Sequence, residues 1–267
     1  MKMKYALVNN DRQEPQPGLV GKCQCCNSVV IAKCGNLRIW HWAHKTKVEC
    51  DPWWEESDWH RAWKEQFPKE WQEIIHKAEN DEKHIADVKT DRGFVIEFQH
   101  SHLHPQERAA REAFYQNMVW VVDGTRLKKD YPRFLEGRKH IKTGYKNGFF
   151  LVHFPEECFP LAWVESSKMV IFDFKTTLPN EPQDEMRNTL WGLLPGRARN
   201  RAVMIGISRQ DFVATAMKQP GLLPEPAHEI VNAYDKLLIE LEAREQHAQT
   251  QRRQTRNPHR ANMPRRL

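Results

Sequence analysis

The segment His84–Gln99, HIADVKTDRGFVIEFQ, constrains the fold of this chain more than any other stretch. Apolar and polar residues alternate within residues 85–89 and again within residues 94–99, which predicts two β-strands. Asp91-Arg92-Gly93 lies between them and has the length of a three-residue hairpin loop. Such a loop needs one residue with positive φ, and Gly93 occupies that position. The stretch therefore predicts a β-hairpin.

The register of this hairpin decides how its two acidic residues lie. If Lys89 faces Val95, Asp87 lies opposite Glu97 on the same face of the sheet. Two ionised carboxylates that close repel each other unless a cation lies between them, and hard oxygen ligands suit Mg²⁺ or Mn²⁺. The alternative is an exposed face with two solvated acids. Ile96 and Phe98 flank Glu97 and predict a strand that is buried on its other face, so the two acids are not on an exposed edge strand. This favours the metal site over two solvated acids.

The segments around the hairpin predict a sheet flanked by helices. Ser57 is a good N-cap, and aromatic residues at helical spacing predict a short helix over residues 57–67. Residues 73–78 favour a strand, with a helix as the alternative. Residues 106–117 predict a helix, and the apolar run 118–122 predicts a buried strand. The order indicates an antiparallel three-stranded meander followed by a crossover, hence a mixed α/β sheet.

The second half of the chain carries fewer signals. Residues 148–154 and 169–174 predict two further strands. Residues 177–200 hold several prolines and glycines and predict an irregular insert. Residues 227–246 predict an amphipathic helix with one apolar stripe. Packing on the core is the usual role of such a stripe, and a partner protein or a homo-oligomer contact is the alternative.

The strings around the two acids resemble a known family. Residues 85–88 (IADV), residues 96–99 (IEFQ) and Ser101 are similar to the competence protein CoiA family and to the PD-(D/E)XK nucleases. The resemblance covers residues 20–155 and implies a restriction-endonuclease-like core. It implies that Asp87 and Glu97 hold Mg²⁺ (or Mn²⁺), helped by the Phe98 carbonyl. Gln99 stands where these nucleases usually have Lys, which puts the catalytic rate in doubt.

The same resemblance extends to the first helix and to the segment after the hairpin. The pattern Glu-Ser-x-x-His-x-x-x-Lys, residues 56–64, matches it, and Glu56 is a candidate to assist the metal. His60 and Lys64 lie one helical turn apart and could both meet a phosphate, although capping and surface polarity explain these two residues equally well. The nucleic-acid-binding residues that the resemblance implies are His60, Lys64, Ser101, Arg111 and Tyr115.

Five of the six cysteines precede residue 51. Clustered cysteines in a chain without a secretion signal fit a reducing compartment and a metal site better than a disulfide framework. Cys23 and Cys26 form a C-x-x-C pair, which can place two thiolates on one cation. Residues 29–31 (VVI) and 38–40 (RIW) predict the two short strands of a zinc-ribbon-like module. Cysteines clustered by chance are the alternative.

The family resemblance also implies a ligand set for this module. In the CoiA family a C-x-x-C is followed by a His-aromatic-Ala-His segment and a later Cys, and residues 41–44 with Cys50 match that order. The implied structural Zn²⁺ ligands are Cys23, Cys26, His44 and Cys50, with His41 as the substitute for His44. Cys25 and Cys34 remain alternatives to Cys23 or Cys50.

Composition limits the class of protein. Hydrophobic residues make up 40% of the chain, enough for a real core, and no run of about 18 apolar residues exists. We expect a cytoplasmic protein. The formal net charge is +6, and residues 245–267 hold six arginines against one glutamate, a net of +5. This basic tail predicts a solvated segment with salt-sensitive, non-specific affinity for nucleic acid.

These observations predict a metal-dependent nuclease that cleaves phosphodiester bonds of DNA, with RNA as an alternative substrate. By resemblance it would act in DNA processing during competence or in phage defence. The competing hypothesis is a nuclease-fold protein with weak or no catalysis that binds nucleic acid or assists assembly. The expected units are a zinc-ribbon-like module (1–52), a nuclease-like domain (53–176), a C-terminal extension ending in a helix (177–246) and a basic disordered tail (247–267).

Overall fold

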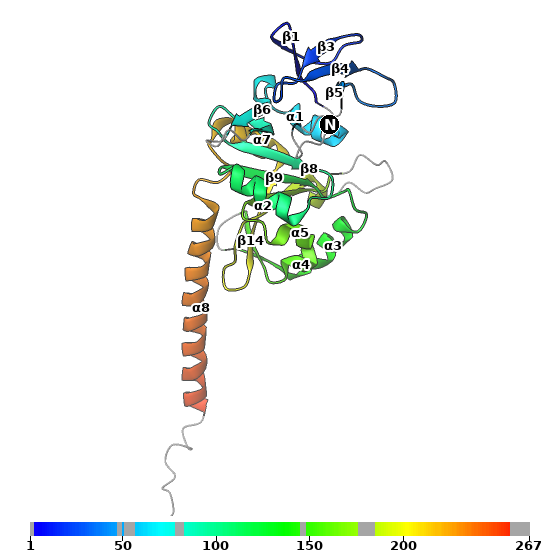
Figure 1. Cartoon of the computed structure of the whole chain (residues 1–267). Coiled ribbons are helices and arrows are strands. Elements are labelled where there is room, and N and C mark those ends of the chain that lie inside the picture. Colours follow the sequence, from blue (N-terminus) through cyan, green and yellow to red (C-terminus); the bar gives the residue numbers. More distant parts are fainter. Residues whose placement is uncertain are drawn as a thin grey trace, which may run out of the picture.

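The computed structural model describes residues 3–46, 50, 57–77, 83–144, 148–175 and 185–256. It contains a small N-terminal β-sheet, a large central sheet flanked by helices, and a long C-terminal helix that projects away from the body (Figure 1). The predicted mixed α/β architecture with a β-rich Cys/His module and a helical C-terminus is confirmed. Within the described residues, no helix combines the length and the apolarity needed to cross a membrane.

The small sheet has the strand order β2-β1-β3-β4-β5. Asn9 and Asn10 have φ values of +52° and +69°, which suit the tight turn between its first two strands. The predicted strand at residues 38–40 is wrong, because the partner of β4 begins at His41, which pairs with Lys33. The strands are β1 (Ala6–Val8), β2 (Asp11–Gln13), β3 (Val20–Lys22), β4 (Val29–Lys33) and β5 (His41–His44).

The large sheet has nine strands in the order β10-β11-β14-β13-β12-β9-β8-β7-β6. The β8–β9 and β9–β12 pairs are parallel, and the other pairs are antiparallel. The predicted meander and the strand-helix-strand crossover are therefore confirmed. Its strands are β6 (Gln72–Lys77), β7 (Lys83–Lys89), β8 (Val95–Gln99), β9 (Met118–Asp123), β10 (Ile141–Thr143), β11 (Phe149–Val152), β12 (Met169–Asp173), β13 (Thr189–Leu193) and β14 (Ala202–Ser208).

The β7–β8 hairpin has the predicted register. Lys89 pairs with Val95, and Val88 pairs with Ile96. The Gly93 N–H donates to the Thr90 carbonyl at 3.0 Å, and Gly93 has φ +75°. A glycine was required here because L-residues rarely adopt this conformation.

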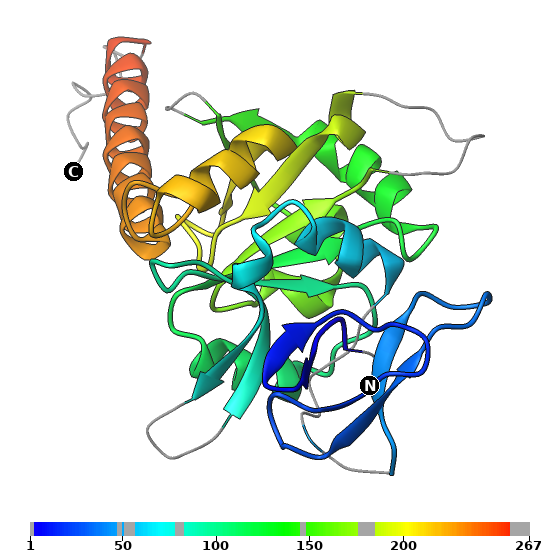
Figure 2. The same cartoon turned by 90° about the horizontal axis from the view of Figure 1, so that it is seen from above.

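Helices cover both faces of the large sheet, as the view from above shows (Figure 2). α1 (Asp58–Lys64), α7 (Arg209–Lys218) and the start of α8 (Ala227–Arg256) pack on one apolar cluster. The helices of the other face pack on a second cluster, which contains Trp120, Phe134 and Phe172. They are α2 (Pro105–Phe114), α3 (Asp130–Gly137), α4 (Pro155–Cys158) and α5 (Leu161–Val164). The short helices η1 (Lys69–Trp71), η2 (Arg138–His140) and α6 (Glu185–Asn188) complete the order.

The expected irregular insert at residues 177–200 is wrong over its second half. Thr189–Leu193 forms β13, which lies between β12 and β14 inside the large sheet. The expected boundary at residue 177 therefore does not separate an extension from the sheet. The helix predicted over residues 227–246 continues to Arg256, so part of the expected disordered tail is helical. Its Ile230, Tyr234 and Leu238 are buried in the core, as the apolar stripe predicts.

The small sheet docks on β6 through buried polar contacts. The backbone N–H groups of Lys4 and Tyr5 donate to the Glu73 carboxylate at 3.0 and 3.1 Å. Arg12 lies over the Tyr5 ring and donates to backbone carbonyls of residues 69 and 72. The N-terminal module is thus held against the edge strand next to the hairpin.

Candidate functional site

Asp87 and Glu97 each reach a backbone N–H group of the neighbouring strand where the β7–β8 pairing ends. Past the Val88–Ile96 pair, the Phe98 N–H donates to Asp87 Oδ2 at 2.9 Å instead of continuing the strand ladder. The Asp87 N–H donates to Glu97 Oε1 at 3.3 Å. Both side chains are buried, with 8% and 4% of their residue surface exposed. Each acid therefore reaches the backbone beside the other, and we call Asp87, Glu97 and the Phe98 backbone the carboxylate site.

His60 lies against this site from α1. Its Nδ1 accepts from the Ser57 N–H at 3.1 Å, so its Nε2 carries the proton and donates to the Phe98 carbonyl at 2.5 Å. His60 is buried and completes a capping box with Ser57. The imidazole predicted to meet a phosphate thus contacts the carbonyl predicted to assist the metal.

Lys64 faces the protein interior, contrary to its predicted role on a surface near phosphate. Its Nζ lies 2.7 Å from Glu73 Oε1, and both side chains are 0% exposed. Sequence spacing placed His60 and Lys64 on one side of the helix correctly, but that side packs on the sheet. The Lys64–Glu73 pair joins α1 to β6.

Gln99 and Ser101 contact each other at the end of β8. Gln99 Nε2 donates to the Ser101 carbonyl and hydroxyl, both at 3.1 Å. Gln99 is 6% exposed, so its amide is held in place beside Glu97. The Gln99 carboxamide can donate and accept hydrogen bonds at this position, but it cannot supply the positive charge of a lysine.

Two residues of the α2 region were predicted to bind nucleic acid, and only one of them lies at the carboxylate site. Arg111 NH1 lies 3.7 Å from Glu97 Oε2, and its NH2 lies 2.5 Å from Glu107 Oε1. Tyr115 is 1% exposed and packs beside Phe114 and His76. Glu56 lies outside the described residues.

Further polar residues gather where the parallel strands end. His100 Nδ1 lies 2.7 Å from Asp123 Oδ2, and Asp123 Oδ1 accepts from the Thr125 N–H at 2.8 Å. On the neighbouring strand, Asp173 accepts from Trp63 Nε1 at 3.0 Å and pairs with Arg209. Burial lowers the pKa of Arg209 to about 10, so the guanidinium stays charged at neutral pH. Sequence reasoning placed His100 near the cleft but missed Asp123, Asp173 and Arg209, although an apolar run ending in Asp marks both β9 and β12.

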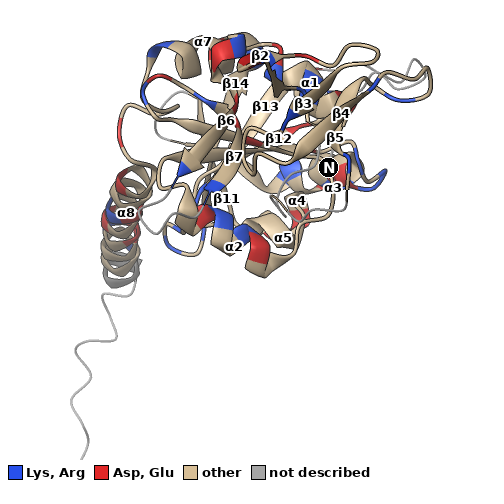
Figure 3. Cartoon of the chain, turned by 45° about the horizontal axis from the view of Figure 1, so that its top comes forward, with Lys and Arg blue, Asp and Glu red and all other residues tan. Residues whose placement is uncertain are grey.

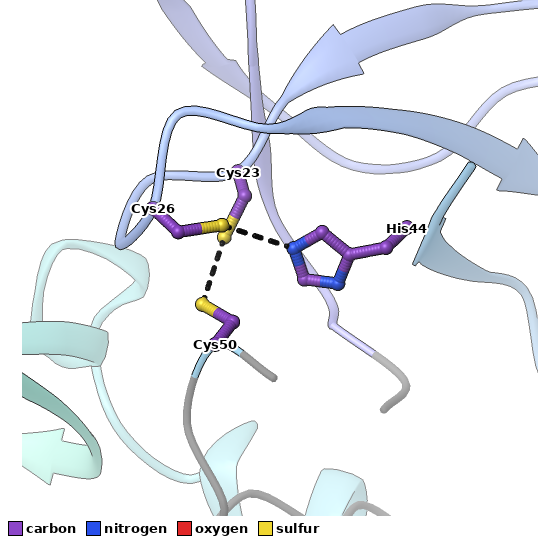
Figure 4. A group of neighbouring side chains, drawn as sticks. All are labelled: Cys23, Cys26, His44 and Cys50. Atoms are coloured by element: carbon purple, nitrogen blue, oxygen red, sulfur yellow. Dashed lines mark hydrogen bonds between the residues drawn. The ribbon is translucent and has the colours of Figure 1, made fainter. Parts of the chain in front are cut away.

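The second candidate site lies in the small sheet. Cys23, Cys26, His44 and Cys50 each offer a ligand atom, and these atoms all lie within 4.8 Å of one another (Figure 4). Cys26 Sγ is 3.2 Å from His44 Nε2, and Cys23 Sγ is 3.6 Å from Cys50 Sγ. A tetrahedral Zn²⁺ with bonds of about 2.0 to 2.3 Å separates its ligands by about 3.5 to 3.8 Å. The group therefore fits zinc.

The electrostatics of this group favour thiolate ligands. Hydrogen bonding from Cys50, followed by backbone N–H groups of Cys26 and Cys25, lowers the pKa of Cys23 to about 5. The same contact with Cys23 raises the pKa of Cys50, because the two sulfurs share one proton when no cation is present. Zn²⁺ binds the deprotonated thiol, so Cys23 is prepared as a ligand at neutral pH.

The remaining candidate ligands lie outside the group. His41 Nδ1 is 2.8 Å from the Ile39 carbonyl, and His41 is not a member of the converging set. Cys25 and Cys34 are not members either, and all six cysteines are free of disulfides. The four ligands that the resemblance implied are thus the four that converge, and four protein ligands leave no open position for a substrate.

Residues 22–52 match the family model described as competence protein CoiA, N-terminal domain. This stretch contains Cys23, Cys26, His44 and Cys50. No curated protein and no solved structure matches the chain. The N-terminal Cys/His module is therefore similar to the N-terminal domain of CoiA.

Proposed function

We propose that the protein is a divalent-metal-dependent nuclease that cleaves phosphodiester bonds of DNA, with the carboxylate site as its centre. The observation that carries the proposal is that Asp87 and Glu97 each reach the backbone of the other's strand where the β7–β8 pairing ends. Both acids are buried, with Arg111 near Glu97, and such hard oxygen donors favour Mg²⁺ or Mn²⁺ as a further cation. The order of elements, with a helix, a meander, a crossover helix and a parallel strand, supports the same proposal.

Each residue of the carboxylate site would have its own role in the reaction. When bound, the metal ion lowers the pKa of a coordinated water and stabilises charge on the scissile phosphate. Asp87 and Glu97 would hold that ion. The Gln99 amide, fixed by Ser101, would orient the attacking water through hydrogen bonding. His60 holds the Phe98 carbonyl and so fixes the end of β8, on which Glu97 and Gln99 both lie.

Arg111 of α2 would supply the positive charge that Gln99 lacks. The Arg111 guanidinium lies 3.7 Å from Glu97 Oε2 and is held by Glu107 on the same helix. A guanidinium stays protonated at any physiological pH and matches phosphate geometry with two parallel donors. Arg111 would therefore bind the phosphate oxygens as the substrate enters.

The zinc module and the matched family segment bear on the biological role. The Cys₃His group would bind a structural Zn²⁺ and hold the N-terminal module together. The similarity of residues 22–52 to a competence protein supports a role in processing of incoming DNA. Phage defence would use the same chemistry.

A second function rests on Gln99 and His60. A buried glutamine without charge and a Phe98 carbonyl engaged by an imidazole would both slow turnover. Under this hypothesis the protein keeps the nuclease fold and binds nucleic acid or assists assembly without cleaving it.

Cleavage assays separate the two functions. Supercoiled DNA, linear duplex, single-stranded DNA and RNA would each be incubated with Mg²⁺ or Mn²⁺. We expect cleavage by the wild type and a loss of at least 100-fold in Asp87→Asn and Glu97→Gln. Asp91→Asn, an exposed acid at the tip of the same hairpin, is the matched control and should keep full activity. No cleavage of any substrate with either ion would favour the second function.

A further inference from the structure

A groove lies between α1 and α7, on the face of the large sheet opposite to α2. Both helices pack on the same face of the large sheet (Figure 2). Trp63 of α1 contacts Phe212 of α7 edge to face at 5.7 Å. The groove has a volume of about 670 Å³, and its lining includes Asp173, the last residue of β12, and Lys175 just after it. We call it the α1–α7 groove. In sheets with parallel strands, ligands bind outside the carboxyl ends of the strands, which is where this groove opens.

The wall contributed by α1 is aromatic. Trp59 is half-buried, and its ring lies edge to face with Trp63, Phe98 and His60 at 6.4, 6.1 and 5.5 Å. These contacts fix the indole while part of it lines the groove. Trp63 is held by its hydrogen bond to Asp173 and by stacking on Phe98. A rigid indole flanked by the apolar side chains of α7 is a platform on which a flat ring can stack.

The opposite wall carries the charge. The charged residues that line the groove are Lys175, Arg209 and Asp173, which makes two cations against one acid. Lys175 is exposed, and Arg209 pairs with Asp173 and begins α7. The first turn of this ten-residue helix adds a partial positive charge at the same place. Gln66 and Gln210 supply neutral hydrogen-bonding groups on the two rims.

Trp59 connects the groove to the carboxylate site. It is adjacent in sequence to His60, whose Nε2 contacts the Phe98 carbonyl, and its ring is 6.3 Å from that of His100. β12 lies two strands from β8, a separation of about 10 Å. Because Glu97 faces Arg111 of α2, a nucleic acid strand that connects the two places would pass around the carboxyl ends of β8, β9 and β12.

We propose that the α1–α7 groove binds an unpaired nucleotide of a single strand, with its base on Trp59 and its phosphate on Lys175 and Arg209. A volume of 670 Å³ lies within the range of small-ligand pockets and leaves room for one nucleotide. Base stacking combined with backbone cations is the usual way in which proteins bind single strands. The inference rests on the proposed function and narrows its substrate to DNA with a single-stranded region.

The test measures binding without cleavage. The full-length, zinc-loaded Asp87→Asn protein would be titrated into a labelled thymidine 12-mer and into a labelled hairpin duplex, and fluorescence anisotropy recorded. Lys175→Glu, an exposed position, should weaken binding of the 12-mer at least tenfold and binding of the duplex less than threefold. Trp59→Leu should weaken binding of the 12-mer about fivefold or more. Lys142→Glu makes the same charge change on the exposed edge strand β10 and should alter either affinity less than twofold.

Three outcomes would overturn the inference. The first is an equal effect of Lys175→Glu and Lys142→Glu on the 12-mer. The second is an equal loss of single-strand and duplex binding in Lys175→Glu. The third is full displacement of the 12-mer by thymidine monophosphate at the same concentration, which would indicate a pocket for free nucleotides. The measurement records binding by Asp87→Asn, which does not depend on cleavage. Its result can therefore be interpreted even if the wild type proves not to be a nuclease.

Discussion

Arg111 NH1 lies 3.7 Å from Glu97 Oε2, and neither side chain is more than 7% exposed. The contact joins α2 to the strand that carries the proposed catalytic acid. A buried carboxylate that loses a charged partner costs far more than a surface ion pair contributes. Arg111 therefore bears on both the stability of the fold and the chemistry of the site.

Replacement of Arg111 by Met should destabilise the protein by about 3 to 5 kcal/mol, because Glu97 would stay buried without its partner. Urea unfolding measures this. Addition of 10 mM Mg²⁺ should restore more stability to Arg111→Met than to the wild type, since the ion takes over the neutralising role. Arg92→Met, which breaks an exposed pair with Asp91, should cost less than about 1 kcal/mol. Equal effects of the two substitutions would contradict the buried contact.

The Lys64–Glu73 pair should behave as a structural contact. Lys64→Met removes the Lys64 ammonium from the Glu73 carboxylate at 0% exposure, and we expect a loss of about 3 to 5 kcal/mol in the free energy of unfolding. The control is Lys69→Met, whose pair with Glu14 is 71% and 45% exposed and should contribute less than about 1 kcal/mol. If Lys64→Met unfolds like Lys69→Met and instead weakens DNA binding, Lys64 is a phosphate ligand after all.

The zinc assignment predicts one Zn²⁺ per chain by elemental analysis of the purified protein. Cys26→Ser and Cys50→Ser should lose that ion, because each removes one of four ligands. His41→Ala should keep it, since His41 contacts the Ile39 carbonyl and does not join the group. Retention of zinc by Cys50→Ser would place the fourth ligand elsewhere.

Acid should destabilise the β6–β7 hairpin through His76. Burial, followed by the nearby Lys89 and His84, lowers the pKa of His76 below its usual 6.5. The folded state thus prefers neutral imidazole, and this stabilisation is present above pH 6.5 and is lost as the pH falls through the folded-state pKa. Between pH 7 and pH 5, the free energy of unfolding of His76→Gln should fall less than that of the wild type. His228→Gln, at an exposed position on α8, serves as the control, and an unchanged slope in His76→Gln would refute the assignment.

The hairpin and its carboxylates were predictable because their determinants are local. Within 16 residues the chain carries the alternation, the glycine turn and both acids, so the register needed no distant partner. The ligand set of the zinc module was predicted from the family resemblance, because spacing alone left Cys25, Cys34 and His41 as alternatives. Strands that depend on contacts with distant parts of the chain were not predictable. β13 is a five-residue strand next to Pro195 and Gly196, and only its neighbours β12 and β14 make it a strand.

The orientation of α1 shows the same limit. Helical spacing put His60 and Lys64 on one side, but the side became internal because their partners, Phe98 and Glu73, lie on separate strands of the sheet. Gly192 was counted as a sign of irregular chain. It lies inside the sheet, and it must be glycine because a Cβ there would come within 2.7 Å of the Met169 side chain and 2.8 Å of the Ile205 side chain. Close packing, which no local pattern reveals, explains this glycine.

Charge distribution was predicted only in part. The excess of arginine toward the C-terminus is real, yet α8 carries side chains of both signs along its described length (Figure 3). Glu242 of α8 forms ion pairs with Arg199 and Arg201, and these pairs hold the helix against the large sheet before it projects outward. The groove between α1 and α7, by contrast, joins residues 59 and 209, a pairing visible only in the fold.

The most direct test of the central claim is the binding of Mn²⁺ to the zinc-loaded protein, followed by electron paramagnetic resonance of the free ion. We predict one site per chain that is lost in Asp87→Asn and in Glu97→Gln and kept in Asp91→Asn. Mn²⁺ binding that is the same in all four proteins, or absent from the wild type, would contradict the assignment of the two acids as a metal site.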